Sequence, residues 1–265
     1  MKISRIWLVP FSPTGSSRKV ITAIAAAMTG IPSEECDLTY AAGVGPRRFG
    51  PDELVIIGVP VYAGRVAPLA VERLQALQGD RTPAVIVTTY GNRDFDDALV
   101  ELRDIARQAS FVPLAAGAFI GEHSFSGAET PIAAGRPDGP DLTIAEAFGA
   151  RIGARLAALE ALDAACCPDL PGNVPYREGA LPLPLTPSLV EAACTQCGIC
   201  LTVCPNEAIT LQDKIAIDVE RCIFCCACIK SCPEEALVID AAPVRQVRQW
   251  LHEHCTARRE PQMYI

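Results

Sequence analysis

Two cysteine runs in the last third of the chain carry the residues best suited to chemistry. Each run has three cysteines spaced two residues apart, then a fourth cysteine three residues further on that is followed by proline. The runs are Cys194, Cys197, Cys200 and Cys204, and Cys222, Cys225, Cys228 and Cys232. Three thiolates at this spacing hold one 4Fe–4S cluster, and the fourth, before proline, ligates the other cluster of a pair. The sequence therefore predicts two clusters with exchanged ligands.

The exchange assigns four cysteines to each cluster. The first set is Cys194, Cys197, Cys200 and Cys232, and the second is Cys222, Cys225, Cys228 and Cys204. An internal duplication supports this register, because corresponding cysteines are offset by 28 positions and Cys-Pro-Asn-Glu-Ala-Ile at 204–209 recurs as Cys-Pro-Glu-Glu-Ala-Leu at 232–237.

The same cysteines allow other interpretations. A pair of zinc sites would use Cys-x2-Cys pairs but would leave the third cysteine and the Cys-Pro element without a role. Disulfides are disfavoured in a chain without a secretion signal. Cys226 stands where the first repeat has Gly198, so register argues against it as a ligand. No role is assigned to the remaining cysteines, which are Cys36, Cys166, Cys167 and Cys255.

Residues 188–240 resemble the two-cluster bacterial ferredoxins, which implies a small α+β domain. Eight ligand cysteines leave few large side chains for a core, so we expect the clusters to act as the core and folding to depend on metal. This segment has three Lys or Arg residues against eight Asp or Glu. An acidic module favours a redox partner protein with a basic docking face.

Length and charge limit the rest of the chain. With 265 residues, half of them apolar, we expect two domains, and the first must supply the large core. A net charge of -8 argues against nucleic acid and anionic membranes as partners. Apolar runs are too short for a transmembrane helix or a signal peptide, so we expect a cytoplasmic protein without membrane insertion.

The first 160 residues alternate between strand and helix patterns. Strands are predicted at 3–11, 36–40, 53–59, 83–89 and 112–120, and helices at 18–28, 67–77, 96–110 and 142–162. This alternation predicts an α/β fold with a doubly wound parallel sheet. Ligands of such sheets bind beyond the carboxyl ends of the strands. Three distinctive loops lie there, at 12–17, 60–65 and 89–97.

The loop Ser12-Pro13-Thr14-Gly15-Ser16-Ser17 joins the first strand to a helix. Free N–H groups at a helix start, the helix dipole and the hydroxyls together suit a phosphate. The loop lacks the Gly-Lys-Ser/Thr of a Walker loop and the Gly-x-Gly-x-x-Gly of a dinucleotide fingerprint. An ordinary helix N-cap with turn residues remains the alternative.

Residues 1–160 look like a flavodoxin, and the whole chain is similar to the flavodoxin/ferredoxin fusion proteins of anaerobes. The resemblance implies a flavodoxin-like sheet that binds FMN. Carried over by position, the residues that would bind the FMN phosphate are Ser12, Thr14, Gly15, Ser16 and Ser17. Those that would lie at the flavin ring are Pro60, Tyr62, Gly64, Tyr90, Gly91, Asn92 and Arg93. The tyrosines and glycines among the latter could instead only pack or turn the chain. No catalytic base or nucleophile is assigned.

Three further segments complete the organisation. The loop at 121–141 contains Glu122-His123-Ser124 and Arg136-Pro137-Asp138, which could close over a flavin, meet the ferredoxin domain or form a solvated loop. We expect a flavodoxin-like domain at 1–162, a semi-rigid proline-rich linker at 163–187, the ferredoxin domain at 188–240, and a helix and tail at 241–265. The helix is predicted to begin at Pro243 and to pack with Val244, Val247, Leu251 and Cys255.

The sequence as a whole predicts an electron-transfer oxidoreductase in which FMN exchanges single electrons with two 4Fe–4S clusters. Two alternatives remain open. One is a flavin-dependent reductase of a small substrate such as a quinone, and the other is a non-enzymatic iron–sulfur sensor without flavin. The direction of electron flow does not follow from the sequence, because cluster potentials span about 1 V.

Overall fold

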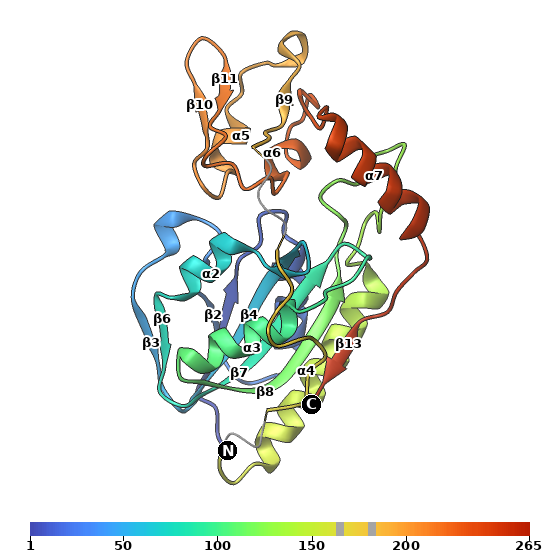
Figure 1. The fold of residues 1–265 in the computed structure, drawn as a ribbon. Helices are drawn as coiled ribbons and strands as arrows, with labels where there is room; N and C mark the ends of the chain where they lie inside the picture. The colour runs from blue at the N-terminus through green and yellow to red at the C-terminus, as the bar shows by residue number, and fades with distance from the viewer. Residues whose placement is uncertain (163–166, 180–183) are drawn as a thin grey trace.

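The computed structural model describes residues 1–162, 167–179 and 184–265. A larger α/β domain carries a smaller cysteine-rich domain at one end of its sheet, and helix α7 (Ala242–His254) leads from the small domain back along the large one (Figure 1). No helix in these three ranges has both the length and the apolar content needed to cross a bilayer.

The large domain is built on one mostly parallel sheet. The strands lie in the order β2-β1-β4-β7-β8-β13, and short β5 pairs with β4. Their bounds are β1 Arg5–Pro10, β2 Ser33–Glu35, β4 Glu53–Tyr62, β5 Arg65–Val66, β7 Thr82–Tyr90, β8 Phe111–Ile120 and β13 Gln262–Tyr264. The five parallel strands follow the order 2-1-3-4-5, which is the flavodoxin-like doubly wound topology. The predicted fold class is confirmed.

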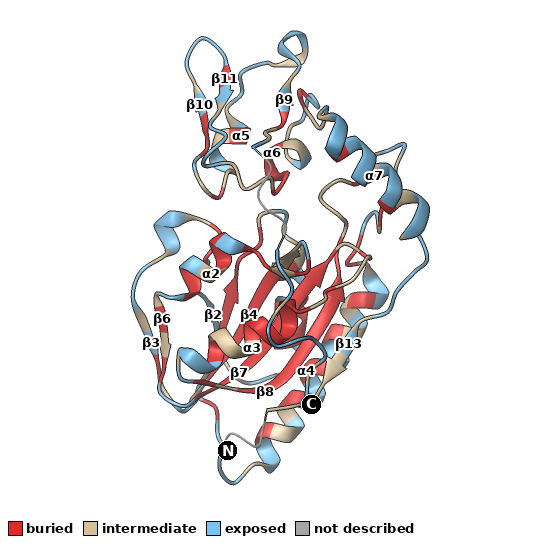
Figure 2. Ribbon diagram, viewed as in Figure 1, coloured by how far each residue is buried: buried red, intermediate tan, exposed pale blue. Residues whose placement is uncertain are grey.

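Helices cover both faces of this sheet, and the central strands between them are buried (Figure 2). The helices are α1 Ser16–Ala26, α2 Pro68–Leu74, α3 Ala98–Gln108 and α4 Gly139–Ala158. One core lies under α2 and α3 and includes Phe11 and Phe49, and the other lies under α1 and α4 and includes Phe119 and Phe148. Burial on both faces explains the near-continuous apolar runs of β4 and β7.

The edge strands differ from the expectation. A strand was predicted at 36–40, whereas β2 is assigned to Ser33–Glu35, which are exposed residues. The backbone N–H groups of Cys36 and Leu38 still donate to the carbonyls of Leu8 and Pro10, so the pairing runs on past the assigned strand. The strand was predicted from the apolar residues Cys36 and Leu38, which form the buried end of this edge segment. Ser33–Glu35 at its beginning are polar, so the sequence did not predict a strand there. At the other edge, β13 pairs antiparallel with β8 and was not predicted.

The described part of the linker lies against α3. The carboxylate of Asp97 accepts hydrogen bonds from the backbone N–H groups of Asn173 and Arg177, and the hydroxyl of Tyr176 donates to Asp104 at 2.6 Å. Leu170 packs against the core under α3. These contacts fix residues 170–177 on the large domain. Residues 163–166 and 180–183 of the predicted linker, including Cys166, lie outside the described residues.

Short paired elements form the small domain. They are β9 Ser188–Leu189, η3 Glu191–Ala193, α5 Ile199–Thr202, β10 Ile209–Leu211, β11 Ile215–Ile217, α6 Ala227–Lys230 and β12 Leu237–Val238. β10 pairs with β11, and β9 pairs with β12, both antiparallel. The buried apolar cluster contains Ile209, Ile215 and Leu237 besides two cysteines. So small a core agrees with the expectation that cofactors must complete it.

The remaining elements lie at the edges of the large domain. β3 (Arg47–Phe49) pairs with β6 (Leu77–Gly79), and η1 spans Ala41–Gly43. Helix α7 starts one residue before the predicted Pro243, and of its expected apolar face Val244 and Leu251 are buried while Val247 is exposed.

Candidate functional site

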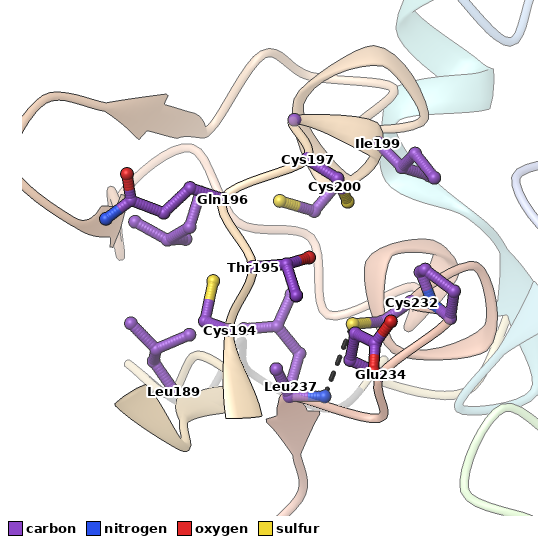
Figure 3. Close-up of a pocket in the computed structure, with 14 residues that line it drawn as sticks. Leu189, Cys194, Thr195, Gln196, Cys197, Ile199, Cys200, Cys232, Glu234 and Leu237 are labelled. Carbon is purple, nitrogen blue, oxygen red and sulfur yellow. Dashed lines mark hydrogen bonds between the residues drawn. The ribbon is translucent and has the colours of Figure 1, made fainter. Parts of the chain in front are cut away.

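Four cysteines from both repeats surround one hollow in the small domain. Cys194, Cys197 and Cys200 come from the first loop, and Cys232 comes from the end of α6 (Figure 3). Apolar residues such as Leu189 and Ile215 also line the hollow, together with polar Thr195, Gln196 and Glu234. The structure thus brings together the first predicted ligand set.

The second predicted set surrounds a second hollow. It is lined by Cys222, Cys225 and Cys228 of the second loop and by Cys204 of the first repeat. Cys226 also borders this hollow. The fourth cysteine of each run therefore lies with the three cysteines of the other run.

The backbone of the two loops follows the duplication. Gln196 and Phe224, 28 positions apart, have φ values of 55° and 51°, and Gly198 and Cys226 have φ values of 76° and 63°. These left-handed turns wrap each loop around its hollow before a short helix begins. Cys226 therefore adopts the same left-handed conformation as Gly198 in the first repeat, although glycine is the residue best suited to it.

Backbone hydrogen bonds to sulfur also repeat in both halves. The N–H of Ala208 donates to Sγ of Cys204, and the N–H of Ala236 donates to Sγ of Cys232, each at 3.2 Å. The sulfur of each crossing cysteine is therefore held in place by a backbone hydrogen bond.

The donor set and the hollows fit an iron–sulfur cluster. A single zinc ion with Zn–S bonds of about 2.3 Å needs its sulfurs within about 4 Å of one another. In the part of the chain that is described, no three His, Cys, Asp or Glu side chains are placed to hold one metal ion. The eight cysteines instead surround two spaces, and all twelve described cysteines are free thiols.

The loop at 12–17 leads into the partly open N-terminus of helix α1. Gly15 has φ +85°, and an added methyl there would meet no atom within 4 Å. Ser16 and Ser17 are the first residues of α1, so their N–H groups have no partner within the helix. The hydroxyl of Ser12 accepts the N–H of Arg18 at 3.1 Å, and that of Ser17 pairs with Thr89 in a buried contact. Thr14 is exposed and Ser16 is half-buried, so their hydroxyls are the ones left for a ligand.

The predicted ring loops pack against the chain's own residues. The N–H of Asp97 donates to the carbonyl of Gly64 at 3.1 Å, and the carboxylate of Asp96 lies against the α-carbon of Gly64. Arg93 pairs with Asp96. The imidazole of His123 fills the space above Gly91. The loops therefore touch each other directly, and contact between a flavin ring and Gly64, Gly91 or Arg93 remains a prediction.

Three other predicted ring residues have structural contacts of their own. Tyr90 is buried and packs on Phe95 with ring centres 5.5 Å apart. The buried amide of Asn92 donates to the carbonyls of Cys255 and Ala257 at 2.6 and 2.9 Å. The carbonyl of Pro60 accepts the N–H of Ala67 at 3.2 Å.

Tyr62 lies where the two domains meet. It is the last residue of β4, and burial, followed by the negative charge of nearby Cys225, Cys226 and Cys222, raises the pKa of its phenol well above the usual value. Ile223, which lines the second hollow, packs against the same core as Tyr62. The second hollow is therefore next to the carboxyl end of β4, where doubly wound sheets bind ligands.

The loop at 121–138 also meets the small domain. The ammonium group of Lys230 pairs with Glu122 and donates to the carbonyl of Ser126 at 2.8 Å. His123 lies 5.0 Å from Phe125 between ring centres, and Phe125 makes an edge contact with Phe224 at 5.7 Å. Of the roles considered for this loop, the structure shows contact with the cysteine-rich domain.

Two features of the site gave no signal in the sequence analysis. The guanidinium of Arg73 donates to the carbonyl of Pro205 at 2.6 Å across the domain boundary. The tail after α7 crosses the large domain, where Arg258 pairs with Asp138 and Asp141, and Arg136 donates to the carbonyl of Arg259 at 2.7 Å. A lone arginine or a short polar tail has no recognisable periodicity, so only the tertiary structure reveals these contacts.

Comparison with known proteins agrees with this architecture. The family model of a 4Fe-4S dicluster domain matches residues 193–236. Among solved structures, a flavodoxin from the domain Archaea matches with 11% identity over 58% of this chain and 99% of its own, at a TM-score of 0.39. Flavodoxin 1 from Bacillus cereus matches with 12% identity over 59% of this chain and 100% of its own, at a TM-score of 0.40. No curated protein matches the chain.

The TM-scores are below 0.5, so the strand order, and not these likenesses, carries the assignment of the N-terminal fold. The chain joins an α/β domain of flavodoxin-like strand order to a 4Fe–4S ferredoxin-type domain.

Proposed function

We propose that this chain is an electron-transfer iron–sulfur flavoprotein with two 4Fe–4S clusters and FMN, which exchanges single electrons with a redox partner protein. The observation that carries the proposal is the position of the second cysteine set: Pro205 beside it binds Arg73, and Ile223 packs against the same core as Tyr62 at the carboxyl end of β4. An iron–sulfur site and the ligand-binding edge of a doubly wound sheet then lie next to each other.

Each part of the chain has a defined task in this proposal. When bound, FMN supplies a carrier of one or two electrons and the clusters supply carriers of one. Cys194, Cys197, Cys200 and Cys232 hold the first cluster, and Cys222, Cys225, Cys228 and Cys204 hold the second. The N–H groups of Ser16 and Ser17 and the hydroxyl of Thr14 hold the phosphate of FMN.

The protein also sets the surroundings of the cofactors. The N–H groups of Ala208 and Ala236 donate hydrogen bonds to the sulfurs of the two crossing cysteines and orient them towards the clusters. Phe224, Phe125 and Ile223 supply apolar packing at the domain contact. The part of the linker that packs on α3 limits how far the domains can separate, so short distances for electron transfer are kept.

The test is to purify the protein without oxygen, to count iron, sulfide and flavin, and to titrate the redox centres. We expect about eight irons and about one FMN per chain. Cys222→Ala should lower iron to about four, whereas Cys36→Ala, a buried thiol outside both hollows, should leave it unchanged. Zinc in place of iron would overturn the proposal, and a brown protein that stays flavin-free after reconstitution would overturn its FMN half.

A further inference from the structure

The two cysteine loops are exposed to very different degrees, although their sequences repeat. Residues at the rim of the first hollow are mostly exposed, and the counterpart of each one in the other repeat is buried or half-buried. The pairs, with the exposed member first, are Thr195 and Ile223, Gln196 and Phe224, Cys197 and Cys225, Ile199 and Ala227, and Pro233 and Pro205. The first hollow therefore faces solvent, and the second faces the large domain.

The chemistry of the loops matches this difference. The first loop has polar Thr195 and Gln196, where the second has apolar Ile223 and Phe224. Ile223 packs against the core of the large domain, and Phe224 contacts Phe125. Burial of such apolar side chains stabilises a contact. The second repeat is therefore specialised for an internal contact.

Hydrogen bonds at the domain contact are likewise confined to the second hollow and its helix. Arg73 binds the carbonyl of Pro205, which borders the second hollow, whereas Pro233 at the first hollow is exposed. Lys230 at the end of α6 binds Glu122, and its counterpart at the end of α5 is exposed Thr202. Nothing in the described chain covers the first loop in this way.

Charge distinguishes the exposed rim as well. Glu234 borders the first hollow and Glu235 follows it, both exposed. Neither has an ion-pair partner within the described residues, whereas the counterpart of Glu235, which is Glu207, pairs with Arg221. The three basic residues of the small domain, Lys214, Arg221 and Lys230, are all paired with carboxylates. The exposed rim therefore presents uncompensated negative charge beside apolar Ile199.

We propose that the first cysteine loop, together with Glu234 and Glu235, is the surface on which a redox protein with lysines and arginines around its cofactor docks, while the second loop serves only the internal contact with the large domain. The inference rests on the proposed function, because it assigns the external and internal ends of the electron path. An exposed acidic rim attracts a basic partner and raises its association rate.

Ferric cytochrome c, a basic one-electron acceptor, is a suitable probe. Dithionite reduces the full-length holoprotein, excess reductant is removed, and one electron then passes from each reduced centre to the ferric haem, which becomes ferrous. Glu234→Gln/Glu235→Gln should lower the second-order rate constant at low salt by about threefold to tenfold and weaken its dependence on salt. The matched control Glu207→Gln/Glu220→Gln removes the same formal charge from the segments next to Cys204 and Cys222, which line the second hollow, and should leave the rate nearly unchanged.

A second measurement does not depend on activity. Carbodiimide joins carboxylates to lysines in contact, and mass spectrometry of the cross-linked complex should locate the links at Glu234 and Glu235. Links at Glu207 or Glu220 would overturn the proposal, as would equal slowing by the control variant. Those results would leave the proposed function standing, whereas absence of iron, or no electron transfer to cytochrome c by the unaltered protein, would contradict the proposed function itself.

A swap of loop residues tests the internal role of the second loop. The double substitution Ile223→Thr/Phe224→Gln gives the second loop the residues that the first loop has at these positions. It should speed amide hydrogen exchange at 121–126 and 222–226. The iron content should stay at about eight per chain. The reverse swap, Thr195→Ile/Gln196→Phe, should leave exchange at 121–126 unchanged. Unchanged exchange at 121–126 in the first variant would show that the second loop is not the domain contact.

Discussion

The guanidinium of Arg73 in helix α2 donates a 2.6 Å hydrogen bond to the carbonyl oxygen of Pro205, which directly follows the cluster-ligand candidate Cys204. The same group donates to the carbonyls of Leu38 and Thr39, so one buried cation connects the edge of the sheet, α2 and the Cys-Pro turn. Burial lowers the pKa of Arg73. Three carbonyl groups accept hydrogen bonds from the charge and the ring of Phe11 lies 5.7 Å away, so these contacts compensate for its removal from water.

Arg73→Met should therefore weaken the contact between the domains. Three buried carbonyls would lose their donor, and we expect a loss of about 3 kcal/mol in the free energy of unfolding. Urea unfolding measures this loss, and limited proteolysis near residues 205–209 should become faster. Arg5→Met is the control, because the ion pair between Arg5 and Glu34 is exposed and should contribute less than about 1 kcal/mol. Equal losses in both variants would show that the Arg73 contact has no special role.

The buried amide of Asn92 should hold the C-terminal tail in place. Asn92 has φ 65°, so Asn92→Gly removes the two hydrogen bonds to Cys255 and Ala257 without adding backbone strain. We expect trypsin to cleave at Arg258 and Arg259 about tenfold faster, which corresponds to a loss of about 1.4 kcal/mol. Gln262→Ala, at an exposed position of β13, is the control and should leave the cleavage rate unchanged. An unchanged rate in the Asn92 variant would assign the tail's stability to β13 and Arg258 alone.

The sequence predicted the parts of the molecule whose residues interact at fixed spacing. The cysteine sets follow from a local motif written twice, and β4 and β7 follow from continuous apolar runs. Residues 262–264 do not show such a pattern. Residues 262–264 pair with β8, and the tail before them is held by contacts with Asn92, Arg136 and Asp138, which are distant in the sequence. Contacts of this kind produce no periodic pattern in the sequence, so they could not be predicted from it.

The difference between the two cysteine loops is already visible in the sequence. Ile223 and Phe224 stand where the other repeat has Thr195 and Gln196, which already indicates that only the second loop has a covered face. The positions of the ring loops were predicted, but their mutual contact through Gly64 and Asp97 was not, because it depends on the backbone path of two separate loops.

Gly15 should be required for the phosphate of FMN. Gly15→Ala places a methyl group in a loop with φ +85°, where the side chain strains the backbone by about 1 kcal/mol and disturbs the N–H groups of Ser16 and Ser17. Gly30→Ala is a matched control, because Gly30 has φ +84°, equally open surroundings and a position beyond the other end of α1. Both variants should lose similar stability, but only Gly15→Ala should weaken FMN binding, by about tenfold, in a fluorescence titration of flavin-depleted protein. Equal FMN affinity in both variants would place the phosphate elsewhere.

Cys226 should be dispensable for iron, although it borders the second hollow. Its φ of 63° and its register match Gly198, so Cys226→Gly restores the residue of the first repeat and relieves backbone strain. We expect about eight irons per chain and an unchanged electron paramagnetic resonance spectrum of the reduced protein. Cys225→Ala, one residue away, should lower iron to about four. Loss of iron from Cys226→Gly would make Cys226 a ligand and would contradict the crossed assignment.

His123 should make stability depend on pH. Burial, and then the charges of Lys230 and Arg93, lower the pKa of its imidazole to about 4. The unprotonated Nδ1 accepts the N–H of Phe125 at 3.0 Å, so the folded protein favours the neutral ring. The ordinary pKa of histidine is about 6.5, so the unfolded chain takes up the proton first as the pH falls. The stability contributed by neutral His123 is therefore complete above pH 6.5 and is lost progressively towards pH 4.

The expected loss from this group between pH 7.5 and 5.5 is about 1 kcal/mol, because the ring is partly exposed. Urea unfolding at the two pH values, without oxygen, should show this extra loss in the unaltered protein and not in His123→Gln. His254→Gln, at an exposed position of α7, should behave like the unaltered protein. If His123→Gln instead loses as much stability over this range as the unaltered protein, the histidine does not titrate differently in the folded and unfolded states, and the contact between Nδ1 and the N–H of Phe125 does not control the protonation of His123.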